Sequence, residues 1–127
     1  MAKSPSLSVL IVDDDITLSL FLKESLAKDG HRVTVTVNEH GAREALAAGR
    51  PDLLLCDFIL PGLDGSEIIR IAKQIYPGLF SVLISGHHAK LASHRNDGSP
   101  ADMVVDKPIL KETLAHIIQQ YRKRIPS

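Results

Sequence analysis

Residues 7–15 read LSVLIVDDD, an apolar run of strand length that ends in three carboxylates. Three later segments also end an apolar run on a polar residue: LLLCD at residues 53–57, SVLIS at 81–85 and MVVDK at 103–107. Continuous apolar runs of this kind are typical of strands buried on both faces of a parallel sheet. Because ligands bind outside the carboxyl ends of such strands, the four runs predict carboxylates, a hydroxyl and an ammonium at one edge of a sheet.

Strand-like runs alternate with segments of helical period along the whole chain. We expect strands at residues 7–12, 31–37, 52–58, 79–85 and 102–105, and helices around 18–26, 41–48, 68–75, 87–96 and 110–121. The third helix has the apolar stripe Ile68, Ile71, Ala72 and Ile75, and a turn-rich loop, PGLDG at 61–65, precedes it. This (βα)5 order predicts an α/β fold of the flavodoxin-like class, a doubly wound five-stranded parallel sheet with helices on both faces.

Length and composition favour a single domain of 127 residues with its core at about residues 7–124. Fifteen Lys and Arg residues balance fifteen Asp and Glu residues, so no net field would attract nucleic acid or an acidic membrane surface. The basic run at 122–124 fits the preference for cations at a helix C-terminus. The sequence has neither an apolar run near the ~20 residues of a membrane span nor a signal peptide. With its single Cys56, the protein is expected to be cytoplasmic.

Asp13, Asp14 and Asp57 follow two strands that this topology can make neighbours. Crowded carboxylates repel one another, and one of them would take up a proton unless a cation lay between them. Mg²⁺ relieves this repulsion, since it binds one or two carboxylates together with waters and a phosphate. Asp14 or Asp15 could instead cap the following helix. We assign the helix cap to Asp15, and we expect Asp13, Asp14 and Asp57 to form a magnesium site.

Asp57 stands at the point where a buried strand ends, and its carboxylate can attack phosphorus to form an acyl phosphate. Phosphoryl transfer requires mainly positioning and neutralisation of charge around a loose transition state. Mg²⁺ on one side and Lys107 on the other would neutralise the phosphoryl oxygens, and Ser85 would donate a hydrogen bond to one of them. The strand ends predict phosphoryl chemistry.

The same residues resemble the receiver domain of two-component response regulators. The resemblance covers nearly the whole chain and rests on four motifs in order: Val12-Asp13-Asp14, Asp57 followed by PGLDG at 61–65, Ile84-Ser85-Gly86, and Lys107-Pro108. It implies that Asp57 is the phosphoacceptor, and that Asp14 and Asp57 bind Mg²⁺ directly while Asp13 binds it through water. The backbone carbonyl of Ile59 would complete the protein ligands.

The resemblance also implies the remaining roles. Ser85 and Lys107 would contact the phosphoryl group, and Gly86 would leave room for it to enter. The donor would be a phosphohistidine on a sensor histidine kinase or a histidine phosphotransfer protein, and the chain would be a signalling phosphoacceptor rather than an enzyme. Contact with a downstream protein or a second copy is expected on the face formed by the fourth helix, fifth strand and fifth helix.

Several positions depart from the family pattern. Val104 stands where receivers usually carry an aromatic residue that reports phosphorylation, so we expect activation to act through backbone shifts after Ser85 and in the fourth helix. Asp106 replaces a small or apolar residue, and strand alternation indicates a surface acid rather than a fourth ligand. Ile59 and His87 occupy the positions that tune the phosphoryl lifetime: Ile59 would shield the acyl phosphate, whereas His87 would either orient water or be solvated.

Two other interpretations fit part of the sequence. Residues 13–18, DDDITL, also match the D-x-D-x-T-L motif of haloacid-dehalogenase-type phosphatases, with Asp13 as nucleophile and Asp15 as general acid–base. That family needs an acidic pair after the Lys, where this chain offers only Glu112 in a helix, and it leaves Asp57 without a role. The other alternative is a degenerate receiver that serves only as a docking module.

Overall fold

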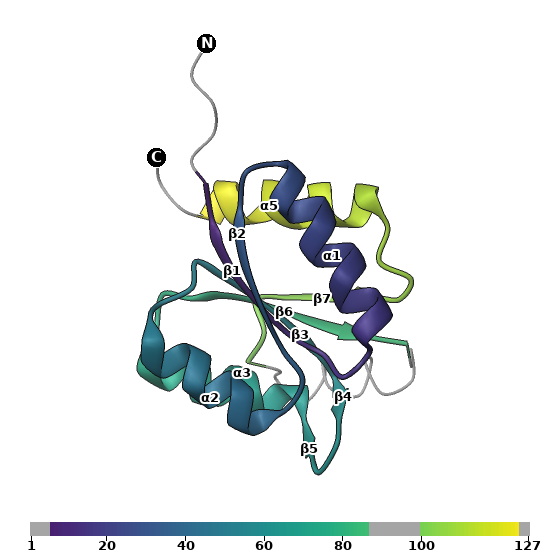
Figure 1. Cartoon of the computed structure of the whole chain (residues 1–127). Coiled ribbons are helices and arrows are strands. Elements are labelled where there is room, and N and C mark those ends of the chain that lie inside the picture. The colour runs from purple at the N-terminus through teal and green to yellow at the C-terminus, as the bar shows by residue number, and fades with distance from the viewer. Residues whose placement is uncertain (1–5, 87–99, 125–127) are drawn as a thin grey trace.

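Five parallel strands form the central sheet of the computed structural model, which describes residues 6–86 and 100–124 (Figure 1). The strands are β1 (Ser8–Val12), β2 (Arg32–Thr36), β3 (Leu53–Asp57), β6 (Phe80–Ser85) and β7 (Met103–Asp106). Their order across the sheet is β2-β1-β3-β6-β7, the flavodoxin-like order of a doubly wound fold. The predicted fold class and all five strands are confirmed, and no strand end is shifted by more than one residue.

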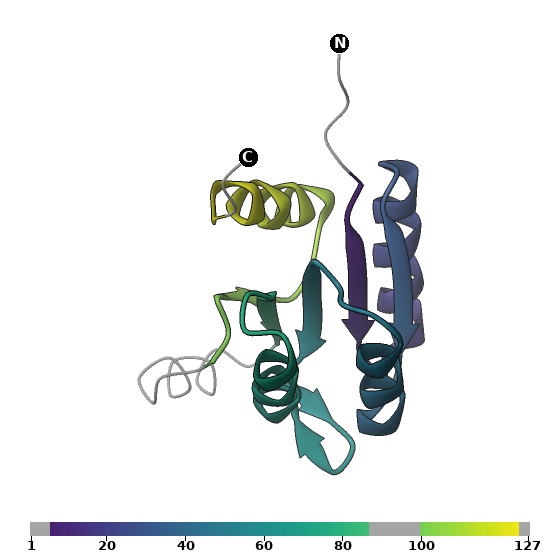
Figure 2. The ribbon, with the colours of Figure 1, turned by 90° about the vertical axis from the view of Figure 1, so that its left-hand side faces the viewer.

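Helices cover both faces of this sheet (Figures 1 and 2). The described helices are α1 (Ile16–Lys28), α2 (Glu39–Ala48), α3 (Gly65–Ile75) and α5 (Lys111–Arg124). Leu53 and Leu55 of β3 pack into the core that α1 and α5 cover, whereas Leu54 and Cys56 pack into the core that α2 and α3 cover. Successive strand residues point to opposite faces, so a continuous apolar run supplies both cores.

Capping residues set where the helices begin. The Asp15 side chain accepts a hydrogen bond from the backbone N–H of Leu18 at 3.1 Å and caps α1, as the sequence predicts. Asn38 caps α2 in the same way, so this helix begins two residues earlier than expected. The predicted fourth helix at 87–96, together with His87, lies outside the described residues. Within the parts that are described, every helix is too short or too polar to cross a membrane.

The region after β3 differs from the sequence prediction. Residues 59–64 form a small antiparallel hairpin, β4 (Ile59–Leu60) and β5 (Leu63–Asp64), where a loop was expected. Gly62 lies in its turn with a φ of 76°, a conformation that favours glycine. Asp64 then caps α3 by accepting hydrogen bonds from Ser66 and Glu67.

Two of the four residues in the predicted apolar stripe of α3 are buried, and the other two are not. Ile68 and Ala72 are buried as expected, but the third apolar position on the sheet side is Ile69. Ile71 is only half-buried, and Ile75 is 50% exposed. The cap at Asp64 places the first helical residue against β3, and this turns residues 65, 68, 69 and 72 toward the sheet.

Candidate functional site

The predicted acidic residues meet where β1 and β3 end. These strands are neighbours in the sheet, with Val12 opposite Cys56, and the chain winds to opposite sides of the sheet after them. In doubly wound folds this switch point is where ligands bind. Carboxylate oxygens of Asp13, Asp14 and Asp57 lie within 4.8 Å of one another, so the predicted cluster is present.

Asp13 carries a buried oxygen that fits a cation. Its side chain accepts the backbone N–H of Asp15 at 2.8 Å through Oδ1, and Oδ2 is buried with no hydrogen-bond partner among the described residues. Burial, together with the charge of Asp57, raises the pKa of Asp13 to about 6. A buried carboxylate oxygen without a donor is costly, and a hard cation with oxygen ligands would satisfy it. The donor set therefore suits Mg²⁺.

Asp57 combines burial with a cationic neighbour. Its side chain is 8% exposed, and Lys107 Nζ lies 3.5 Å from its Oδ2. Burial and the charge of Asp14 raise its pKa, whereas Lys107 and a backbone hydrogen bond from Ile59 act against that rise. The pKa of Asp57 remains above its ordinary value. Asp14 is exposed, so the cluster has two buried carboxylates and one that faces solvent.

Ser85 and Lys107 come to the same edge through the pairing of β6 with β7. The backbone N–H of Lys107 donates to the Ser85 carbonyl at 2.9 Å, and the Lys107–Pro108 peptide bond is cis. A Cβ built on Gly86 would contact only Lys107 Cδ, at 3.9 Å, among the described residues, so this position leaves space beside the lysine. Asp106 is half-buried rather than a surface acid, and it is not part of the carboxylate cluster.

Gly65 supports the site in a way that the sequence interpretation missed. Its N–H donates to the Phe58 carbonyl at 2.7 Å, and a Cβ at this position would lie 2.1 Å from the Asp57 carbonyl oxygen. Only glycine allows α3 to approach the backbone of Asp57 so closely. The PGLDG sequence shows a turn but not the close contact across it.

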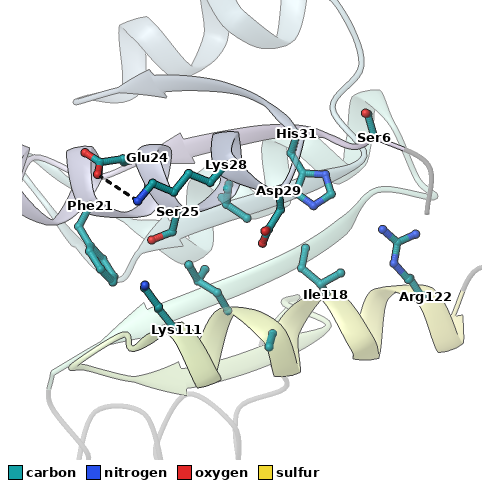
Figure 3. A pocket seen from close by; sticks show the side chains of 14 residues that line it. Ser6, Phe21, Glu24, Ser25, Lys28, Asp29, His31, Lys111, Ile118 and Arg122 are labelled. Carbon is teal, nitrogen blue, oxygen red and sulfur yellow. Dashed lines mark ion pairs between the residues drawn. The ribbon is translucent and has the colours of Figure 1, made fainter. Parts of the chain in front are cut away.

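A cavity lies away from these residues. It has a volume of about 1230 Å³ and lies between α1 and α5, with Phe21, Ile118 and Arg122 among its lining residues (Figure 3). Glu24 and Lys28 form an ion pair on its α1 side. Its lining includes none of the acidic cluster, so this cavity is separate from the candidate site at the sheet edge.

The fold and this edge site together define a known class of protein. The Response regulator receiver domain family matches residues 9–119, and the chain belongs to that family. Among curated relatives, the response regulator receiver protein CpdR of Brucella abortus is 32% identical over 112 residues, covering 88% of this chain and 93% of CpdR. The transcriptional regulatory protein AfsQ1 of Streptomyces coelicolor is 38% identical over 117 residues, covering 92% and 52%.

The chain also matches longer relatives and solved structures. The transcriptional regulator NtrC of Escherichia coli K12 is 31% identical over 126 residues, and the match spans 91% of this chain but only 26% of NtrC. A receiver domain protein of Methanospirillum hungatei superposes with a TM-score of 0.84 at 23% identity, covering 94% of this chain and 97% of that one. A receiver protein of Sinorhizobium medicae gives 0.80 at 28% identity, covering 94% and 98%. These matches give no support to the phosphatase interpretation.

Proposed function

We propose that Asp57 accepts a phosphoryl group from the phosphohistidine of a sensor kinase or phosphotransfer protein, and that this changes which proteins the chain binds. One observation carries the proposal: a buried carboxylate lies 3.5 Å from Lys107 and beside two further carboxylates. A structural acid would not need this arrangement. The chain acts as a signalling phosphoacceptor and promotes only its own phosphorylation and dephosphorylation.

In the proposed reaction, an Asp57 carboxylate oxygen forms a bond to phosphorus while the bond from phosphorus to the donor imidazole breaks. The electron pair of that bond stays with the imidazole nitrogen, and Asp57 becomes an acyl phosphate. Lys107 holds one phosphoryl oxygen by charge, and Ser85 donates a hydrogen bond to another. Gly86 leaves space for the group to enter.

Mg²⁺ is the proposed cofactor: Asp14, Asp57 and the backbone carbonyl of Ile59 would hold it directly, and Asp13 would hold it through water. When bound, the ion supplies positive charge to the phosphoryl oxygens. The buried Oδ2 of Asp13 supports this assignment from within the chain. TrrA of Thermotoga maritima, which has the same fold at a TM-score of 0.78 and 24% identity, is described in complex with Mg²⁺ and BeF.

The wider setting is part of the proposal. We treat the chain as one receiver domain with its core at residues 7–124, and we propose that it works in the cytoplasm. A downstream partner, or a second copy, would bind the face that includes β7 and α5. The fourth helix of that face lies outside the described residues, as does His87.

The test is to incubate the protein with Mg²⁺ and phosphoramidate, and then to locate the added phosphoryl group by mass spectrometry. We expect label on Asp57, loss of label in Asp57→Asn, and full label in the control Asp15→Asn, which keeps a side chain that can cap α1 and removes only its charge. Label on Asp13, or steady release of phosphate from added esters, would instead indicate phosphatase chemistry. Absence of label would leave only a docking module.

A further inference from the structure

Asp102 lies just before β7, at the end of the sheet opposite Asp57. Its side chain contacts residues of α3, β6 and α5. Its carboxylate accepts hydrogen bonds from Lys73 Nζ at 2.7 Å, from the Ser81 backbone N–H at 2.8 Å and from Ser81 Oγ at 3.2 Å. Arg124 of α5 lies 3.1 Å from its other oxygen. The Asp102 side chain is only 10% exposed.

The contacts keep this buried group charged. Burial by itself would raise the pKa of Asp102, but the hydrogen bonds from Lys73 and Ser81 and the charges of Lys73 and Arg124 hold the pKa below its usual value. Arg124 also lies over the Phe80 ring at 5.6 Å. Lys73 is 23% exposed and Arg124 is 59% exposed, so these ion pairs contribute little net stability. The best-established role of such a pair is to select one arrangement over others.

We consider that these contacts select the register of β7 relative to β6. Among the described strands β7 is an edge strand, hydrogen-bonded only to β6. Met103 and Val105 pack into one core and Val104 into the other, so both faces are apolar. Within these three residues, a slip by one position would exchange one apolar side chain for another. The register is therefore specified by the polar residues that flank the run, Asp102 and Asp106.

Asp102 favours the observed register over registers that are shifted by one or more residues. Its backbone N–H donates to the Ser81 carbonyl at 3.0 Å, while its carboxylate accepts from the same residue. Any slip would leave the carboxylate buried without these donors, which is unfavourable for a charged group. It would also move Lys107 by about 3.3 Å per residue, similar to the 3.5 Å between Lys107 and Asp57.

We propose that Asp102 is a positioning residue for phosphoryl transfer: it fixes β7 on β6 and so places Lys107 beside Asp57. The inference rests on the proposed function of Asp57. It assigns a role in the reaction to a residue that never touches the phosphoryl group and lies at the far edge of the sheet.

A double-mutant cycle between Asp102 and Lys107 tests this role. The rate constant of Asp57 phosphorylation by phosphoramidate is measured in the wild type, Asp102→Ala, Lys107→Ala and the double variant, under conditions in which each is fully folded. We expect Asp102→Ala to lower the rate constant about tenfold in the wild-type background and to change it less than about twofold once Lys107 is absent. Equal fold losses in both backgrounds would show a merely structural role and overturn the proposal.

Hydrogen exchange at the Lys107 amide gives a second readout that does not depend on phosphorylation. We expect faster exchange in Asp102→Ala, because the Lys107 N–H bond to Ser85 marks the register. Tyr76→Phe is the control: it removes the hydroxyl bond to Leu46, away from β7, and should leave this amide unchanged. Unchanged exchange in the Asp102 variant would contradict the inference.

Asp102→Asn keeps the size of the side chain and replaces the alanine variant if that variant does not fold. It should shift both readouts in the same direction. Failure to label wild-type Asp57 would refute the proposed function alone, because amide exchange would still decide whether Asp102 sets the register.

Discussion

Asp13 and Asp57 are both buried carboxylates, yet their neighbours differ. Asp57 has the Lys107 ammonium 3.5 Å away. Among the described residues, Asp13 has the backbone N–H of Asp15 on one oxygen and no donor on the other. The cation near Asp57 can stay in contact with an incoming phosphoryl group. The unsatisfied oxygen of Asp13 suits a metal ion. The two acids are therefore suited to different tasks.

Gly65 provides the first prediction at the residue scale. Gly65→Ala would place a Cβ 2.1 Å from the Asp57 carbonyl oxygen, so α3 or the end of β3 must shift. We expect a loss of about 2 kcal/mol in the free energy of unfolding and slower labelling of Asp57. Urea unfolding and the phosphoramidate assay measure these effects.

Gly49→Ala is the matched control for Gly65. In the part of the chain that the structure describes, a Cβ at Gly49 would have nothing within 4 Å, and the φ of 172° at Gly49 is extended backbone that any residue adopts. This variant should remain within about 0.5 kcal/mol of the wild type. Equal behaviour of the two variants would contradict the argument that α3 needs a glycine against Asp57.

Ile59 provides the second prediction. Its side chain is 44% exposed, two residues after Asp57, and its backbone bonds to the Asp57 carboxylate. Ile59→Asn replaces an apolar cover with a group that can orient an attacking water, so we expect dephosphorylation about fivefold faster. Ile75→Asn, which alters a similarly exposed isoleucine at the end of α3, is the control. An unchanged decay of the acyl phosphate in Ile59→Asn would remove this role.

The sequence predicts the candidate site residues that stand at strand ends, but it gives no signal for residues whose role depends on contacts made after folding. Asp13, Asp57, Ser85 and Lys107 could be predicted because parallel strands bring their carboxyl ends to one edge. Asp102 could not, since its partners come from α3, β6 and α5 and meet only after the sheet is formed. The same limit applies to Gly65, whose role depends on its distance from the Asp57 backbone.

At the scale of elements, the strands were predicted more accurately than the helix faces. A strand such as β3 is buried on both faces, so a continuous apolar run predicts it without deciding which face points to the core. In α3 the isoleucines at 68, 69, 71 and 75 allow more than one apolar stripe, and the position of the Asp64 cap selects among them. The β4–β5 hairpin was missed because two-residue strands carry almost no pattern.

His31 links the starts of β1 and β2 and provides the third prediction. Its Nδ1 accepts the Leu7 N–H at 3.0 Å, beside the cavity between α1 and α5 (Figure 3). Burial and the charge of Arg122 lower the pKa of His31, while Asp29 acts weakly against them. Only the neutral ring accepts this bond, so the folded protein disfavours the proton. The stability it contributes is present above the unfolded pKa of about 6.5 and is lost as pH falls toward the lower folded pKa.

Urea unfolding at about pH 8 and about pH 5 measures this effect in the wild type and in His31→Gln. The wild type should lose about 1 kcal/mol more than the variant between the two conditions. His40→Gln, at an exposed histidine of α2, should follow the wild type. If His31→Gln showed the same pH dependence as the wild type, the bond to Leu7 would not be the titrating feature.

At the scale of the whole molecule, the sheet separates two polar clusters. The carboxylates and Lys107 lie at its carboxyl edge, and Asp102 lies at its amino edge, with β6 and β7 running between them. β6 and β7 are apolar and closely packed between the two clusters. A change at one edge therefore affects the other edge by moving the strands and not through direct interaction of charges. Stability and phosphorylation should therefore respond to changes at either edge.

Magnesium binding provides the last prediction, because the acidic edge makes the metal-free protein less stable at neutral pH. The pKa of Asp13 is raised from 3.8 to about 6, so the folded state binds this proton more tightly than the unfolded chain. Stability therefore falls as pH rises from about 4 to above about 6, by on the order of 3 kcal/mol. Mg²⁺ should reverse this loss, adding about 2.7 kcal/mol at a hundred times its Kd.

Thermal unfolding with and without Mg²⁺, at about pH 5 and about pH 7.5, measures both effects. The gain from Mg²⁺ should be larger at the higher pH, where Asp13 is ionised, because protons compete with the metal for the same oxygens. Asp13→Asn should raise the metal-free stability at the higher pH and abolish most of the gain. Glu24→Gln, at an exposed acid of α1, should behave like the wild type. A gain from Mg²⁺ that was equal at both pH values and survived Asp13→Asn would place the ion elsewhere on the molecule.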